Sequence, residues 1–193
     1  MEKIMEKLKV LIGVDESNMT GSVRGFGRKM EWCPARDYLA NPNEGRYLSE
    51  MVVYVGLPPN TEQFREKRAK KEKFVHYLRT KGFMVVIKEG HPAGIGEYKS
   101  NVDVLMSNDL LELASEIRPD IVVICSGDYE FGDLARRLRR KGIRVEVASV
   151  GDKLSNELKA AANSVIDLEP LLNQFERMDP QAGVIGTDAV FDL

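Results

Sequence analysis

Carboxylate side chains follow two apolar runs of the sequence. The run LKVLIGV ends at Asp15, and the run VVIC passes through a Ser-Gly pair to Asp128, with Glu130 two positions further on. Apolar runs without polar alternation are typical of parallel strands that helices cover on both faces. Because ligands of open α/β sheets bind outside the carboxyl ends of the strands, we expect these acids to gather at one edge of a sheet.

A third acidic position lies in the first turn of a helix that the pattern predicts over residues 100–117. Asp103 occupies this turn, and Lys99 stands just ahead of it. Several carboxylates in one cleft repel one another, and a bound Mg²⁺ or Mn²⁺ best explains such a cluster. A cation of this kind can orient a water and stabilise the charge of a reacting phosphodiester. Lys99 is then placed to contact the phosphate or to stabilise the transition state.

Each of these residues also has an explanation that needs no function. The helix dipole alone favours Asp103 at a helix N-terminus by roughly 0.3–1 kcal/mol, and Glu130 could serve the next helix in the same way. Asn18 could cap the first helix, a role that fits Asp15 less well because Asp15 ends the strand. Asp128 follows a buried strand directly and fits these explanations least. The sequence therefore favours a metal–carboxylate site around Asp128.

Missing residues argue against other site chemistries. The two cysteines, Cys33 and Cys125, and the two histidines give neither a zinc pattern nor a disulfide framework. The chain has no GxGxxG and no GxxxxGK[ST] motif, which argues against dinucleotide-binding and P-loop folds. Asp15 lacks a second aspartate two residues on, which argues against an aspartyl-phosphate hydrolase. Asp109 lies about 120° around its helix from Asp103 and is expected behind the site or at the surface.

Composition predicts one domain in the cytoplasm. The chain has 193 residues, of which 43% are apolar, and this is enough for one domain with a core. Charged residues make up 30% although the net charge is only −2, so charges are sorted locally. The basic segments 64–73 and 136–144 could contact phosphates or form solvated helix faces. The first ten residues lack the apolar core of a signal peptide, and no apolar run approaches the roughly 18 residues of a membrane span.

The chain alternates predicted strands with predicted helices. Strands are predicted at 7–14, 49–56, 83–88, 121–125, 143–149 and 164–168. Helices are predicted at 61–81, 100–117, 130–141 and 154–163. Glycines and prolines mark most of 20–48 and 89–101 as loops, although ARDYLA at 35–40 could form one or two helical turns. This order predicts an α/β protein with three α/β/α layers and a mainly parallel sheet of five to six strands. Residues 170–193 lack clear periodicity and are expected to be a docked or partly disordered extension.

Four short motifs in this order resemble a known family. They are VDESN at 14–18, the K-x-x-x-D step from 99 to 103, SGDYEF at 126–131 and GIRVEVASVGDKLSNELKAAANSVIDL at 142–168. Together they resemble the NYN domain of the LabA-like branch, which belongs to the PIN-like nuclease superfamily. The resemblance covers about residues 8–168 and implies an NYN (PIN-like) domain over 1–169. It also implies a metal-dependent ribonuclease, with RNA as the partner and Mg²⁺ or Mn²⁺ as the cofactor.

The resemblance assigns roles to eight residues. The catalytic carboxylates would be Asp15, Asp103, Asp128 and Glu130, and the first three would also hold the metal. The residues that would position the substrate are Asn18, Lys99, Ser126 and Gly127.

Three positions depart from the family pattern: Glu130 stands where aspartate is usual, Asn163 where aspartate is common, and Glu16 where small residues are frequent. The alternatives are a non-catalytic RNA-binding or regulatory module and a small-molecule phosphoesterase on the same fold. A homo-oligomer stays open, and no contact with membranes is expected.

Overall fold

The computed structural model describes residues 7–178 and contains a six-stranded parallel sheet. Its strand order is β3-β2-β1-β6-β7-β8, and every pairing in it is parallel. The strands are β1 Leu8–Asp15, β2 Arg46–Leu57, β3 Met84–Glu89, β6 Ile121–Cys125, β7 Arg144–Ser149 and β8 Ser164–Asp167. All six predicted strands are present, and the mainly parallel α/β/α architecture is confirmed.

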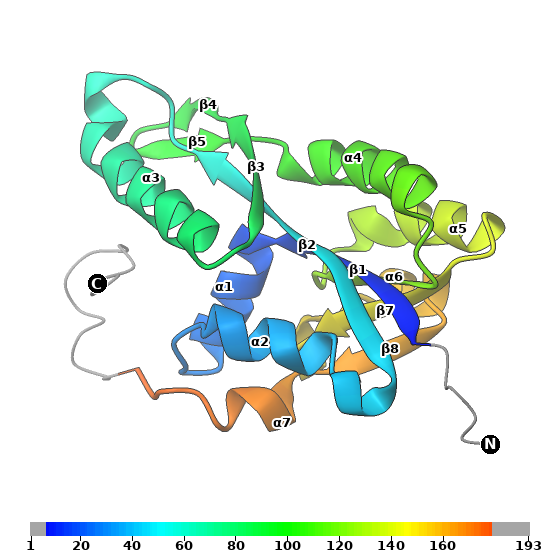
Figure 1. Cartoon of the computed structure of the whole chain (residues 1–193). Coiled ribbons are helices and arrows are strands. Elements are labelled where there is room, and N and C mark those ends of the chain that lie inside the picture. Colours follow the sequence, from blue (N-terminus) through cyan, green and yellow to red (C-terminus); the bar gives the residue numbers. More distant parts are fainter. Residues whose placement is uncertain (1–6, 179–193) are drawn as a thin grey trace, which may run out of the picture.

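Helices cover both faces of the sheet (Figure 1). One face carries α1 Glu16–Gly25, α2 Trp32–Leu39, α3 Arg65–Thr80 and α7 Glu169–Leu172. The other carries α4 Val102–Ile117, α5 Gly132–Arg140 and α6 Asn156–Ala161. Within β1, Val10 and Ile12 join the first core, while Leu11 between them joins the second. The strands read as unbroken apolar runs because both of their faces are buried.

The two central strands place the carboxylates. β1 and β6 are parallel neighbours, with Val14 beside Cys125, so their carboxyl ends lie at the same edge of the sheet. From this pair the chain builds outward in two directions, through β2 and β3 on one side and through β7 and β8 on the other. Such a reversal of strand order leaves a crevice at the carboxyl ends, where ligands of open α/β sheets bind.

Two segments predicted mainly as loops contain regular structure. Much of segment 20–48 is helical in α1 and α2, where α2 includes most of ARDYLA, followed by the short 3-10 helix η1 Pro42–Glu44. Gly21 and Gly25 lie within α1 although each costs helix stability. The helix forms because its N-terminus is capped and because Met19 and Val23 pack into the core. Tertiary burial here outweighs local propensity.

In the second of these segments, 89–101, the predicted loop is wrong because the chain forms an antiparallel hairpin. Its strands are β4 His91–Gly94 and β5 Glu97–Lys99, and Gly96 takes the positive φ of 73° at the turn between them. Tyr98 anchors the hairpin, because its hydroxyl donates to the Gly56 carbonyl at 3.2 Å and its ring meets Phe64 edge-on. The hairpin ends at Lys99, just before α4.

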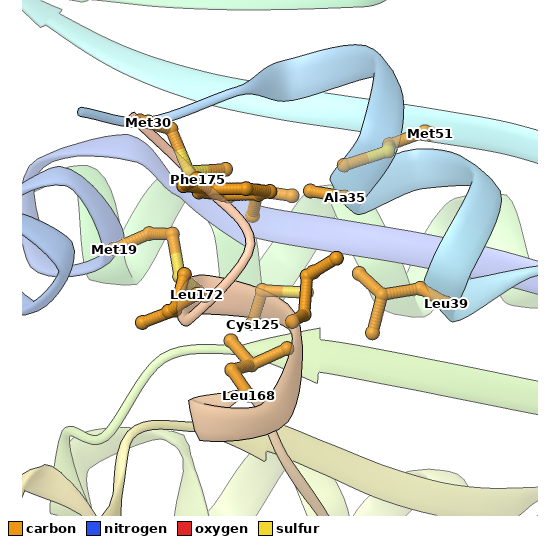
Figure 2. Close-up of a pocket in the computed structure, with 11 residues that line it drawn as sticks. Met19, Met30, Ala35, Leu39, Met51, Cys125, Leu168, Leu172 and Phe175 are labelled. Carbon is orange, nitrogen blue, oxygen red and sulfur yellow. The ribbon is translucent and has the colours of Figure 1, made fainter. Parts of the chain in front are cut away.

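The described part of the C-terminal extension is docked on the first core. α7 and the residues after it bring Leu172 and Phe175 against α1, α2 and the sheet (Figure 2). The apolar cavity between them measures only about 10 Å³, roughly the volume one water needs, and its wall includes the Cys125 side chain. Residues 179–193 lie outside the described part of the chain. None of the helices between residues 7 and 178 is long and apolar enough to cross a membrane.

Candidate active site

Asp15 forms the first part of the site at the end of β1. Its Oδ1 accepts hydrogen bonds from the Asn18 N–H at 3.2 Å and from the Ser17 hydroxyl at 3.0 Å, so Asp15 itself caps α1. The cap had been expected at Asn18 rather than at Asp15. The side chain is only 8% exposed, and this burial raises the pKa of Asp15. The charges of Glu16 and Asp128 raise this pKa further, which places Asp128 close to Asp15.

Asn18 and Gly127 join the turns that follow β1 and β6. The Asn18 Oδ1 accepts a hydrogen bond from the Gly127 N–H at 3.0 Å. A Cβ at Gly127 would lie 2.0 Å from the Lys153 carbonyl oxygen, so no larger residue fits without a shift of the backbone. The Gly127 carbonyl also accepts from the Ser155 N–H at 2.9 Å. These contacts fix the loop that leads into Asp128.

Asp128 is held by its own neighbours. Its N–H donates to the Ser126 hydroxyl at 3.2 Å, and its Oδ1 accepts from the Glu130 N–H at 3.1 Å. The second bond makes Asp128 the cap of the 3-10 helix η3 Tyr129–Phe131. Ser126 is buried and Asp128 is half-buried, so the carboxylate leaves a packed strand and reaches the surface at the crevice.

Glu130 and Asp103 share a hydrogen bond between their side chains. This bond, followed by the charge of Asp103, raises the pKa of Glu130. Desolvation and the charge of Asp128 raise it as well, whereas the charge of Lys99 lowers it. Asp103, Asp128 and Lys99 therefore all lie close to Glu130.

The donor chemistry of this cluster fits a hard divalent cation. Its ligating atoms are carboxylate oxygens, and a bound cation would offset the repulsion from Asp103 and Asp128 that raises the pKa of Glu130. Among residues 7–178, however, no three His, Cys, Asp or Glu side chains already form a metal-holding group. Mg²⁺ is commonly bound by one or two carboxylates together with waters and substrate phosphates, so a closed protein cage is not required.

Two other acidic residues, Asp109 and Asp133, do not contact the carboxylate cluster in the described part of the chain. Asp109 accepts a hydrogen bond of 2.7 Å from the buried Tyr54 hydroxyl, which places it behind the site. Burial, followed by the contact with Asp109, raises the pKa of Tyr54 far above its ordinary value. Asp133 is exposed and lies on α5, away from the hydrogen bonds of the cluster.

Glu16 and Tyr129 were not assigned roles at the site from the sequence. Glu16 is 2% exposed and pairs with Lys71 on α3 at 2.7 Å, with Thr20 donating to its other oxygen at 3.1 Å. This pair fixes α1 against α3, and no local pattern reveals a contact across 55 positions. Tyr129 stands between Asp128 and Glu130 and is 58% exposed. The sequence feature that indicates a role for Tyr129 is its position inside the SGDYEF motif.

Comparisons with known proteins identify the family and the fold. The profile of the NYN domain family matches residues 9–169. A crystal structure of a protein of unknown function from Vibrio parahaemolyticus is similar with a TM-score of 0.67 and 25% sequence identity, covering 88% of this chain and 97% of that chain. A cobalamin-binding protein from Desulfitobacterium hafniense is 15% identical over 61% of this chain and 53% of its own, and its TM-score of 0.25 carries no argument. No protein with a curated function gives a significant match.

Proposed function

The chain belongs to the NYN domain family, and from this membership we propose that it is a divalent-metal-dependent ribonuclease of the LabA-like branch. The observation that supports the proposal best is the contact between Glu130 and Asp103 beside Asp128, which raises the pKa of Glu130. Perturbed acidic groups of this kind cluster at functional sites. Their place at the carboxyl ends of β1 and β6 matches the ligand crevice of α/β sheets.

In this proposal Asp15, Asp103 and Asp128 hold Mg²⁺ or Mn²⁺ through carboxylate oxygens. The bound cation would supply a water of lowered pKa and stabilise negative charge on the phosphodiester. Glu130 would assist directly or through a water. The neighbouring Lys99, which is exposed at the end of β5, would draw the scissile phosphate toward the carboxylates.

The substrate would be RNA with at least one unpaired base near the cut. Tyr129 presents a largely exposed aromatic ring between two of the carboxylates. Aromatic rings of this kind stack on the bases of single strands with little sequence preference. The loop that carries Asp128 is held by contacts of Asn18, Ser126 and Gly127. These three residues would therefore position the carboxylate without contacting the substrate.

A non-catalytic RNA-binding module is the second candidate. Two observations favour it: the described residues hold no preformed three-ligand metal group, and Glu130 is one carbon longer than the aspartate usual at this place. In that case the acidic crevice would bind metal weakly, and RNA would be held without cleavage.

Cleavage of a labelled single-stranded RNA in Mn²⁺ separates the two candidates. We expect the wild type to cleave and Asp128→Asn to lose at least about 100-fold in rate, in line with the loss of a key catalytic group. Asp152→Asn is the matched control, because Asp152 is an exposed aspartate on the 3-10 helix η4 Gly151–Lys153 and should leave the rate unchanged. Equal cleavage by wild type and Asp128→Asn would refute the assignment of this site, and an inactive wild type that binds RNA would favour the second candidate.

A further inference from the structure

A basic groove lies along α5 and the turn into β7, and it leads from the side of the acidic crevice toward the opposite edge of the sheet. It has a volume of about 720 Å³ and is lined by α5, by the turn into β7 and by the segment that follows α6. Four arginines line it, Arg136, Arg139, Arg140 and Arg144, and Asp133 is its only acidic lining residue among the described ones. We call these four residues the arginine groove. A cluster of this kind on a chain with a net charge of −2 needs an explanation.

The charges of the arginine groove are poorly neutralised. Arg139 donates to the neutral carbonyl of Ala161 at 2.8 Å, which leaves its charge uncompensated. Arg140 makes no hydrogen bond or ion pair with any residue in the described part of the chain. Arg136 faces Glu157 at 3.6 Å with both side chains half exposed, and such pairs contribute little.

The fourth arginine is only partly neutralised. Arg144 contacts Glu146 at 2.9 Å, but the same carboxylate also accepts from Arg46 at 2.7 Å. Arg46 also contacts Glu44 at 3.6 Å. The Arg144 side chain is 52% exposed, so part of its charge faces solvent. The groove keeps a net positive field that solvent alone would have to screen.

The other basic helix of the protein behaves differently. On α3, Arg68 pairs with Glu72 at 2.9 Å and with Glu89 at 3.1 Å, while Lys71 pairs with the buried Glu16. Several of the cations in segment 64–73 therefore hold α3 against its neighbours. On α5, by contrast, no arginine of the groove pairs with a buried carboxylate of residues 7–178.

The arginine groove begins near the carboxylates and leads away from them. α5 starts at Gly132, two residues after Glu130, and its nine residues extend about 13 Å. Its far end turns into β7, and Arg144 opens that strand at the edge of the sheet opposite the crevice. Asp133 marks the end next to the crevice, so the cationic part starts about one turn further along.

We propose that the arginine groove binds the sugar-phosphate backbone of the RNA strand beyond the scissile bond. The proposal rests on the proposed function, because it takes RNA as the molecule at the crevice. Guanidinium groups match phosphate oxygens in a two-pronged geometry. The groove arginines of α5 span about 6 Å from Arg136 to Arg140, enough for roughly two phosphates at the spacing of a stacked strand, and Arg144 lies beyond them. The substrate is thus an RNA several nucleotides longer than the crevice alone requires.

The test measures binding of fluorescent single-stranded RNAs of 4 and 12 nucleotides in EDTA, where cleavage cannot interfere. The variant is Arg140→Gln, and the matched control is Arg137→Gln, which removes the same charge from the same helix at an exposed position outside the groove. For the 12-mer we expect Arg140→Gln to bind about fivefold more weakly, in line with about 1 kcal/mol. Its slope of log affinity against log salt should fall by about 0.7. The 4-mer should show little difference.

Arg137→Gln should remain close to wild type for both RNAs. Equal losses in the two variants, or no loss in either, would overturn the groove whatever the cleavage assay shows. Vesicles of phosphatidylcholine with phosphatidylserine provide a second arm. If the vesicles bind the wild type but not Arg140→Gln, and both proteins bind RNA equally well, the groove binds a lipid surface and the proposal is wrong. Conversely, groove-dependent RNA binding in a protein that never cleaves would refute only the ribonuclease.

Discussion

Asp15 shows how a residue can serve the site at the expense of stability. Burial raises its pKa, so its ionised form is disfavoured in the folded protein. The penalty is absent at low pH, develops as the pH rises above the unfolded pKa of about 3.9, and is complete above the raised folded pKa. At neutral pH the metal-free protein therefore carries the full penalty. A bound cation would remove it.

Asp15→Asn should raise the melting temperature of the metal-free protein at pH 7. The amide keeps an oxygen that can accept from the Asn18 N–H and the Ser17 hydroxyl, so the α1 cap survives. Each kcal/mol gained should add about 2–4 °C, and the gain should vanish at low pH. Mn²⁺ should raise the melting temperature of the wild type but not that of the variant. A variant that melts lower than wild type in EDTA at pH 7 would contradict this account.

The residue types of the site can be predicted from the sequence, but their contacts cannot. Asp15, Asp103 and Asp128 stand out because each follows a strand or begins a helix, which is local information. The bond from Gly127 to Asn18 joins positions 109 apart, and only the pairing of β1 with β6 brings them together. The raised pKa of Glu130 cannot be predicted from local sequence either, because it depends on Asp103 in another helix.

At the scale of elements, the loop after β6 depends on the absence of a side chain at Gly127. Gly127→Ala should destabilise the protein by about 1–3 kcal/mol and lower RNA cleavage, because the new Cβ collides with the Lys153 backbone and shifts Asp128. Gly21→Ala is the control: its Cβ meets nothing within 4 Å inside α1, and it should stabilise by about 0.5–1 kcal/mol. Chemical denaturation of both variants measures this difference. Similar stability in the two would show that the loop is freer than the structure implies.

The elements that the sequence predicts poorly are those fixed by distant partners. The six strands and four of the helices follow from apolar runs that are buried on both faces or on one. α1 contains Gly21 and Gly25, and its stability comes from the Asp15 cap and from core packing, so propensity alone points to a loop. The β4–β5 hairpin is likewise held by Tyr98 against Gly56 and Phe64, which lie on other elements.

At the scale of the whole molecule, one buried carboxylate connects two distant strands of the sheet. Glu146 on β7 accepts from Arg46 on β2, across β1 and β6, and from Arg144. Although burial by itself raises the pKa of Glu146, the bonds and charges of the two arginines outweigh it, and the net pKa is lowered. Glu146 therefore contributes stability above its unfolded pKa that is lost as the pH falls through the lowered one.

Glu146→Gln should destabilise the protein by about 1–3 kcal/mol at pH 7, because it leaves the largely buried Arg46 guanidinium without its closest anion. The variant should also lose less stability than wild type between neutral and acidic pH. Glu44→Gln provides the comparison, since Glu44 contacts the same Arg46 at 3.6 Å from an exposed position and should cost less than about 1 kcal/mol. Urea titrations over a range of pH values measure both effects. Matching costs in the two variants would rule out a special role for the buried pair.

The hydrophobic core extends past residue 169, where the match to the NYN family ends. The sequence pattern of residues 170–178 does not predict this. Phe175 is 3% exposed, and the segment around it pairs with the loop after α1, where Arg28 donates to the Phe175 carbonyl at 3.0 Å. Phe175→Ala should therefore cost about 3–5 kcal/mol, as for a core phenylalanine. Met178→Ala, three residues on at a 39% exposed position, should cost far less. If thermal unfolding shows equal melting temperatures for both variants, segment 170–178 merely rests on the surface, and the fold is complete without it.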